Sequence, residues 1–325
     1  MISRTPLPDA ARAASPAATN ERIPALGIAL TVLLTFIWGS SWPLMKICVE
    51  SLQPWNFRML TTLVAGAFML AIVRASGTSI LVPRRKWPAL AMVSLFNITA
   101  WMLCSAFALQ LLPAGRSAII AYTMPAWAVL LGAVFLRERI TGPRALGLVL
   151  GLGGLGVLMG DDLVQLGRAP LGTAIMSLGA FSVALSMVLL KRIRWDLPVG
   201  TMSAWQLVLG GVPIAVGAIL ADQGTIGAFG WREAGALAFV FFVGVMVGNW
   251  TWLKMISLMP ASVASIGTIA IPVVGVGTSL LVLGEPIGWQ ELAALALVVA
   301  SLATVLGRRP GGHRPPPSGG GGAAR

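Results

Sequence analysis

The chain has 325 residues, of which 57% are hydrophobic and only 10% are charged. Soluble domains carry about 25% charged residues, so a chain this apolar cannot present enough polar surface to water and is expected to lie in lipid. Its net charge of +12 would suggest nucleic acid in a soluble protein. Here the basic residues are spread over many short segments between apolar stretches, so no nucleic acid partner is expected.

The two ends of the chain differ from its middle. Residues 1–24 are polar, and residues 308–325 read RRPGGHRPPPSGGGGAAR, so both are expected to be disordered tails. Between them lie ten stretches close to the ~20 apolar residues that a membrane-spanning helix needs. The predicted spans are 26–46, 55–75, 87–110, 114–136, 144–160, 171–191, 199–221, 234–254, 261–284 and 289–307. The sequence therefore predicts an all-α integral membrane protein with ten transmembrane helices.

Lys and Arg residues indicate how these spans are oriented. If the N-terminus is inside the cell, 18 of the 23 basic residues fall in cytoplasmic segments. The other five, which fall at outer ends or in outer loops, are Lys46, Arg58, Arg116, Arg168 and Arg232. Because cytoplasmic loops carry an excess of Lys and Arg, both termini are predicted to be cytoplasmic.

The fourth and ninth spans repeat each other 147 positions apart. The pairs in this register include Pro113 with Pro260, Ile119 with Ile266, Pro125 with Pro272, and Glu138 with Glu285. The repeating unit is therefore five spans, assigned to residues 25–160 and 161–307. An odd number of spans inserts the second copy upside down, and inverted repeats of this kind are typical of secondary transporters.

The paired prolines and glutamates receive separate interpretations. Pro125 and Pro272 fall in the middle of their spans, where proline removes a backbone hydrogen bond, so they are candidate hinges. A static kink that only improves packing remains the alternative. Glu138 and Glu285 fall just beyond their spans, and each is expected to cap the next helix or to pair with a neighbouring base, such as Arg137 or 139, rather than to carry protons.

The GLGGLG stretch (residues 151–156) matches a nucleotide-binding pattern but lies inside an apolar span with no strand before it. Gly147 and Gly151 form a G-x-x-x-G pattern, which instead predicts close packing of the fifth span on another helix. Cys48 and Cys104 are expected to be buried free thiols. No metal site and no cofactor are expected.

Three segments carry a resemblance to a known family. FIWGSSWPLMK (36–46), NFRML (56–60) and PASVASIGTIAIPVVGVGTSLLVLGEPI (260–287) resemble the EamA-type ten-helix members of the drug/metabolite transporter superfamily. The likeness covers residues 25–307. It implies a helix bundle around a central cavity, usually exporting small metabolites, amino acids or drugs from bacteria. One departure is LRERI, where Arg137 replaces the glycine usual before Glu138.

Polar and aromatic residues near the middle of the spans are the candidates for a solute site, because polar groups in lipid are costly. The predicted cavity residues are Trp38, Ser40, Ser41, Asn97, Trp101, Tyr122 and Asn249. Hydrogen bonding between neighbouring helices is the alternative for each of them.

Lys46 and Arg58 lie near the outer ends of the first two spans. With Arg116 they are interpreted as a positive vestibule for a carboxylate, the alternatives being an i,i+4 pair between Lys46 and Glu50 and snorkelling to lipid headgroups.

The sequence thus predicts a multi-pass secondary transporter of the bacterial inner membrane, which exports small organic solutes by alternating access. An integral-membrane enzyme and a structural or receptor-like membrane protein are the alternatives. The expected partners are a small-molecule substrate and the lipid bilayer, and a homodimer is left open.

Overall fold

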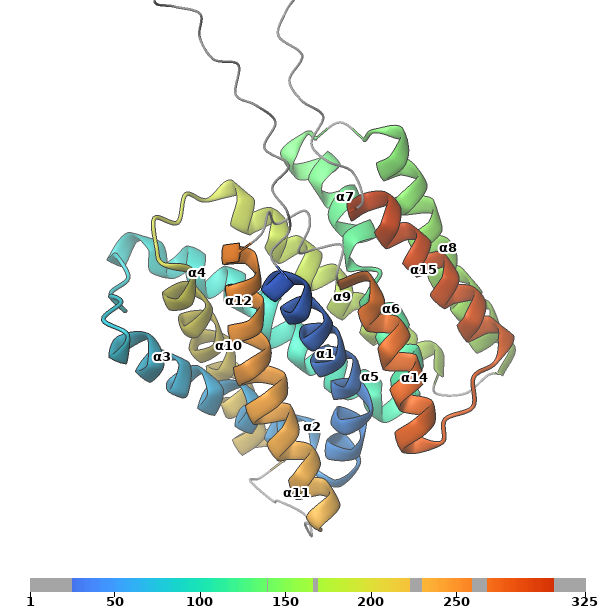
Figure 1. Cartoon of the computed structure of the whole chain (residues 1–325), viewed down its shortest axis with the longest axis horizontal. Helices are drawn as coiled ribbons and strands as arrows, with labels where there is room; N and C mark the ends of the chain where they lie inside the picture. Colours follow the sequence, from blue (N-terminus) through green and yellow to red (C-terminus); the bar gives the residue numbers. More distant parts are fainter. Residues whose placement is uncertain (1–24, 139, 166–168, 223–229, 259–267, 307–325) are drawn as a thin grey trace, which may run out of the picture.

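The computed structural model describes residues 25–138, 140–165, 169–222, 230–258 and 268–306. These residues form a bundle of helices without a strand (Figure 1). Within these ranges, eight helices are long and apolar enough to cross a membrane, and two shorter apolar helices, Ile271–Leu283 and Trp289–Thr304, occupy the ninth and tenth predicted spans. The prediction of an all-α membrane protein with ten spans is confirmed.

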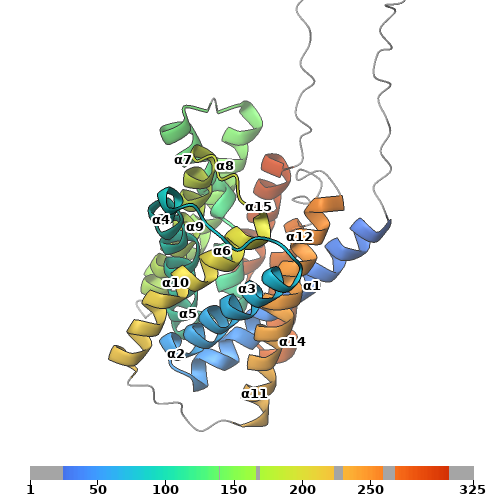
Figure 2. The same cartoon turned by 90° about the vertical axis from the view of Figure 1, so that its left-hand side faces the viewer.

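Several spans are built from more than one helical segment. The first five comprise α1 (Ala25–Ser51), α2 (Pro54–Met59), α3 (Ala65–Ala75), α4 (Trp87–Ser94), α5 (Trp101–Leu111), α6 (Ala114–Ala121), α7 (Met124–Leu136) and α8 (Gly142–Gln165). The last five comprise α9 (Ala169–Arg192), α10 (Val199–Ala221), α11 (Trp231–Ala238), α12 (Gly248–Leu258), α14 (Ile271–Leu283) and α15 (Trp289–Leu306). Figure 2 shows the end of α7, the start of α8 and the end of α15 at the upper end of the bundle, opposite the start of α11.

Three spans are interrupted by π-helical segments. These are η1 (Leu60–Val64) in the second span, η3 (Leu95–Ala100) in the third and η4 (Phe239–Val247) in the eighth. The third and eighth spans correspond in the repeat, and η3 shifted by 147 positions falls within η4. A π segment shifts the backbone hydrogen-bond register, and such segments are frequent at functional sites.

Helices α7 and α14 reproduce the repeat in three dimensions. Each has 13 residues and begins and ends at positions 147 apart. Each begins with a residue followed by proline and ends at a left-handed residue, which is Arg137 (φ 55°) in α7 and Gly284 (φ 68°) in α14. The replacement of glycine by Arg137 therefore leaves the backbone conformation unchanged, although only glycine adopts it without steric cost.

The prolines begin helices rather than bending them. Pro125 is the second residue of α7, and α6 has already ended at Ala121, with Tyr122 and Thr123 outside both helices. The first N–H groups of a helix have no partner within the helix, so proline at this position costs no hydrogen bond. Pro272 holds the same place in α14. The expected bend at Pro125 is thus a break that precedes it, whereas α14 directly follows the short 3-10 helix η5 (Thr268–Ala270). A hinge at either proline stays a prediction.

Helix α1 crosses the middle of the bundle and packs on α12 and α14 of the second repeat. The contact with α14 is close because Gly39 has no side chain: a Cβ atom there would lie 2.5 Å from Cγ1 of Val274. The fifth span packs on α15, as the G-x-x-x-G pattern predicted. A Cβ at Gly151 would lie 3.0 Å from the Ser301 hydroxyl, which donates a hydrogen bond to the Gly147 carbonyl.

The outer surface of the bundle is apolar. Large hydrophobic side chains such as Phe36, Phe68, Val134, Ile219 and Leu281 are exposed on it. Soluble monomers rarely expose contiguous apolar patches of this extent, whereas a lipid-facing surface requires them. The chain is therefore a multi-pass membrane protein.

Candidate functional site

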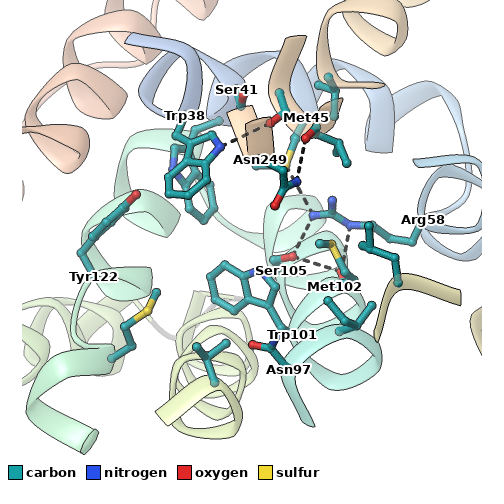
Figure 3. Close-up of a pocket in the computed structure, with 18 residues that line it drawn as sticks. Trp38, Ser41, Met45, Arg58, Asn97, Trp101, Met102, Ser105, Tyr122 and Asn249 are labelled. Carbon is teal, nitrogen blue, oxygen red and sulfur yellow. Dashed lines mark hydrogen bonds between the residues drawn. The ribbon is translucent and has the colours of Figure 1, made fainter. Parts of the chain in front are cut away.

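A cavity of about 350 Å³ lies among helices of both repeats (Figure 3). This volume is in the range of pockets that hold small organic molecules. The lining residues from the first repeat are Trp38, Ser41, Trp42, Met45, Arg58, Asn97, Ile98, Trp101, Met102, Ser105, Tyr122 and Met124. Those from the second repeat are Val183, Leu207, Val240, Gly244, Val245 and Asn249.

Helix α1 forms one wall of the cavity against the π segment η4. The indole N–H of Trp38 donates to the Gly244 carbonyl at 3.3 Å, and its ring packs on Trp252 with centroids 5.9 Å apart. The Ser41 hydroxyl donates to the carbonyl of Ile37 at 2.6 Å, one turn earlier in α1. Trp38 and Ser41 of the WGSS motif therefore line the cavity, and Trp38 also contacts the second repeat.

The third span supplies a second wall. The ring of Trp101 meets Trp42 edge-on, with centroids 6.4 Å apart. Asn97, on η3, donates from its amide nitrogen to the side chain of Gln206 at 2.7 Å, and its amide oxygen accepts from Ser186 at 3.2 Å. Because both ends of the Asn97 amide are engaged by the second repeat, this side chain holds the wall together as well as lining it.

Tyr122 and Asn249 complete the set of predicted residues at the cavity. Tyr122 follows the last residue of α6 and lies at the break before α7, so its ring enters the cavity at the proposed hinge (Figure 3). Asn249, on α12, donates to the Val245 carbonyl at 2.6 Å. The prediction placed polar groups from the first, third, fourth and eighth spans near one another, and the structure brings them together.

Arg58 is placed in the cavity wall and not in an outer vestibule. It is only 3% exposed, and its Nε donates to the Met102 carbonyl at 2.9 Å. Its Nη2 donates to the Ser105 hydroxyl at 2.7 Å and reaches Sδ of Met45 at 3.5 Å. Arg58 also lies 4.7 Å from the centroid of the neighbouring Phe57 ring. Arg58 lies about one turn into the second span, close to its outer end. This position alone does not show that the side chain points inward to the cavity.

Two other predicted residues do not line the cavity. The Ser40 hydroxyl instead donates to the Phe36 carbonyl at 2.6 Å. The ammonium group of Lys46 donates to the carbonyls of Leu109 and Leu112, the latter at 3.1 Å, and lies 3.6 Å from Glu50. Since the last carbonyls of a helix lack partners within it, Lys46 caps the end of α5.

Charged residues outside the cavity are held by structural contacts. Arg116 is 6% exposed, bonds to the Leu158 carbonyl and lies 3.7 Å from Glu291, so it contributes to no open vestibule. Glu285 accepts from the backbone N–H groups of Ala114 and Gly115 at 2.7 and 3.1 Å. It thus caps a helix, as expected, but the helix is α6 in the other repeat and not the next one.

Glu138 forms ion pairs, as expected, with different partners from those predicted. Its carboxylate lies 3.2 Å from Arg144 and 3.3 Å from Lys191. No pairing with Arg137 is observed, and position 139 lies outside the described residues. Glu138 therefore joins the end of α7 to α8 and α9.

Sequence reasoning missed several of the lining residues. Met45, Trp42, Met102 and Ser105 line the cavity without having been predicted. Ser105 carried a usable signal, because a hydroxyl in an apolar span needs a partner and the second span carries Arg58 near the same end of the bundle. The methionines carried none, since an apolar side chain fits a lipid-facing position equally well.

The chain belongs to the EamA-like transporter family, which it matches over residues 25–160 and 170–307. It is therefore a membrane transporter of the drug/metabolite kind.

Curated relatives agree with this assignment. The chain is 28% identical to the uncharacterized transporter YvbV of Bacillus subtilis, over 85% of this chain and 90% of the relative. It is 23% identical to a probable amino-acid metabolite efflux pump of Escherichia coli, over 86% and 95%, and 25% identical to the uncharacterized inner membrane transporter YedA of that organism, over 84% and 88%. A solved crystal structure matches with a TM-score of 0.60 at 21% identity, over 86% and 95%, which shows the same fold.

Proposed function

We propose that this protein is a secondary transporter that carries small organic solutes out of the cell through the central cavity by alternating access. The observation that carries the proposal is that residues of both inverted repeats line the cavity. Transporters built from inverted repeats place their solute sites at the repeat interface and expose them to the two sides in turn. The names of two relatives as probable efflux pumps support the direction of transport.

The break between α6 and α7 supports the proposed movement. Tyr122 lies at this break and at the cavity, so a change in the angle between α6 and α7 would alter the cavity wall. Helix α14 begins at Ile271, directly after η5, and its second residue is Pro272, which corresponds to Pro125. The change from 3-10 to α-helix at this point is the corresponding junction of the second repeat. We propose that these two junctions are the hinges, each bending as the cavity opens to one side.

Two adjacent serines offer a matched test of the route. Ser41 lines the cavity, whereas Ser40 on the neighbouring face of α1 does not. Ser41 lies close to Gly244: a Cβ atom added to Gly244 would lie 3.1 Å from the Ser41 hydroxyl oxygen. The larger leucine side chain at position 41 would therefore fill cavity space beside Gly244. Leucine is well tolerated in a membrane helix, so both variants are expected to insert.

The experiment measures solute efflux from cells and from proteoliposomes for the wild type, Ser41→Leu and Ser40→Leu. We expect Ser41→Leu to abolish most of the flux of whichever solutes a metabolite screen identifies, and Ser40→Leu to retain it. Gel filtration of each purified variant checks folding. Equal flux in both variants would show that solutes do not use this cavity, and the absence of any flux in the wild type would overturn the proposed function.

A further inference from the structure

The cavity holds one cationic side chain and no anionic one among the lining residues that the structure describes. Arg58 supplies this charge from the second span, and Figure 3 shows its guanidinium pointing toward Ser105 and the Asn249 side of the cavity. Burying an ionised group away from water is expensive unless it is paired. A charge at this depth therefore requires an explanation.

No carboxylate within the described ranges forms a salt bridge with Arg58. Its recorded partners are a carbonyl, a hydroxyl and a thioether sulfur, which are all neutral. No hydrogen-bond partner is recorded for Nη1 among the residues described. The guanidinium group offers five N–H donors in a planar fork that matches a carboxylate, so part of this fork is left for an anion.

A role as a clip between helices accounts for only part of the arrangement. Arg58 joins the second span to Met102 and Ser105 of α5. Hydrogen bonds to a carbonyl and a hydroxyl need a donor but not a charge, and a neutral donor would avoid the desolvation cost of the guanidinium. The Phe57 ring, 4.7 Å from the guanidinium, favours the positive charge but supplies no negative one. A purely structural role therefore leaves this charge without a counter-ion among the described residues.

The rest of the cavity suits an apolar or aromatic body. Trp38, Trp42, Trp101 and Tyr122 contribute rings to its wall, and the edge-on pair of Trp42 and Trp101 presents a rigid aromatic surface. Flat aromatic side chains bury large apolar areas and stack with other rings. A ligand with a carboxylate at one end and a hydrocarbon or aryl group at the other matches both parts of this cavity.

We propose that the cavity binds organic monocarboxylates, with the carboxylate on the guanidinium group of Arg58 and the apolar body among the tryptophan rings. This inference rests on the proposed function and names its substrate class. A net anion is favoured over a cation, because the cavity carries a positive charge and no carboxylate within its described lining. The neutral amide of the same acid retains the apolar contacts but forfeits the charge-assisted hydrogen bonds.

The test uses 3-phenylpropionate and its neutral isostere 3-phenylpropionamide as probes. Binding is measured by calorimetry on the purified full-length protein in micelles, with blank titrations into empty micelles. The variants are Arg58→Gln, which keeps hydrogen-bond donors, and Arg58→Lys, which keeps the charge but not the fork. Arg74→Gln is the matched control, since Arg74 lies on the same span but is exposed and outside the cavity.

We expect the wild type and Arg74→Gln to bind the acid about tenfold more tightly than the amide, or better, because hydrogen bonds to charged groups are strong. Arg58→Gln should lose this preference, and Arg58→Lys should keep part of it. A preference retained in Arg58→Gln, or a loss of acid and amide binding by the same factor, would overturn the proposal in favour of a structural clip.

A wild type that shows no preference, or that binds neither probe, would also overturn it. These outcomes are separable from failure of the proposed function. Solute flux and its block by Ser41→Leu are measured independently. A positive transport result would therefore support the proposed function even if the carboxylate site were refuted.

Discussion

The close approach of α1 and α14 makes Gly39→Ala a sharp test of the packing between the repeats. The new Cβ would lie 2.5 Å from Cγ1 and 2.7 Å from Cβ of Val274, and 3.2 Å from the backbone nitrogen of Gly275. Ordinary carbon contacts are about 3.5–4.0 Å, so the shortfall is about 1 Å. A new rotamer of Val274 would move Cγ1 but not Cβ. The helices must therefore separate.

Overpacking of this kind costs about 1–3 kcal/mol. Alanine is more favourable than glycine within a helix by about 0.5–1 kcal/mol, so we expect the free energy of unfolding to fall by up to about 2.5 kcal/mol. Gly277→Ala in α14 is the matched control, since a Cβ there meets nothing within 4 Å. It should raise stability by about 0.5–1 kcal/mol.

The assay is unfolding in mixed detergent–SDS micelles, followed by circular dichroism. Val274→Gly removes both clashing carbon atoms, so the double variant Gly39→Ala/Val274→Gly should be more stable than the sum of the single changes, by about 0.5–3 kcal/mol. Because Gly39 lies between Trp38 and Ser41 in the cavity wall, solute flux should fall with stability in the single variant. If Gly39→Ala proves as stable as Gly277→Ala, the two helices are not this close and the reasoning fails.

Three further predictions follow from the ends of the helices. Arg137→Gly should raise stability by about 0.5–1 kcal/mol, because it removes a side chain from a left-handed residue; the converse change Gly284→Arg should lower the unfolding midpoint, and opposite shifts in either variant would refute the backbone argument. Lys46→Met should lower the free energy of unfolding by about 1–3 kcal/mol, through the loss of bonds to the Leu109 and Leu112 carbonyls, and should leave the acid-over-amide preference unchanged; a changed preference in the binding assay would return Lys46 to the solute path. A reporter that is active only in the periplasm, fused after residue 309, should stay silent if both termini are cytoplasmic; strong activity would contradict the charge-based orientation.

Membrane insertion and the repeat were predictable because lipid imposes strict requirements on sequence. A span must be about 20 residues long and nearly uncharged, which marks its position without any tertiary information. Pro125, Pro272 and their glutamates recur 147 positions apart, and the structure gives α7 and α14 matching ends. The sequence also indicated which spans carry the polar and aromatic groups that now surround one cavity.

The rotation of each helix and the reach of each side chain were decided only by tertiary structure. Neighbouring residues of an α-helix lie about 100° apart around its axis, so Ser40 and Ser41 looked equivalent in the sequence although only Ser41 reaches the cavity. A cation near the end of a span can pair with an acidic side chain, a lipid headgroup or backbone carbonyls. The tertiary structure shows that Lys46 binds carbonyls at the end of α5 and that Arg58 lies in the cavity wall. Glu285 likewise caps a helix of the other repeat, 171 positions away from Ala114, because the fold brings those two ends together. The sequence thus determined the solvent and the repeating unit, whereas contacts between distant segments determined which polar groups face the solute path.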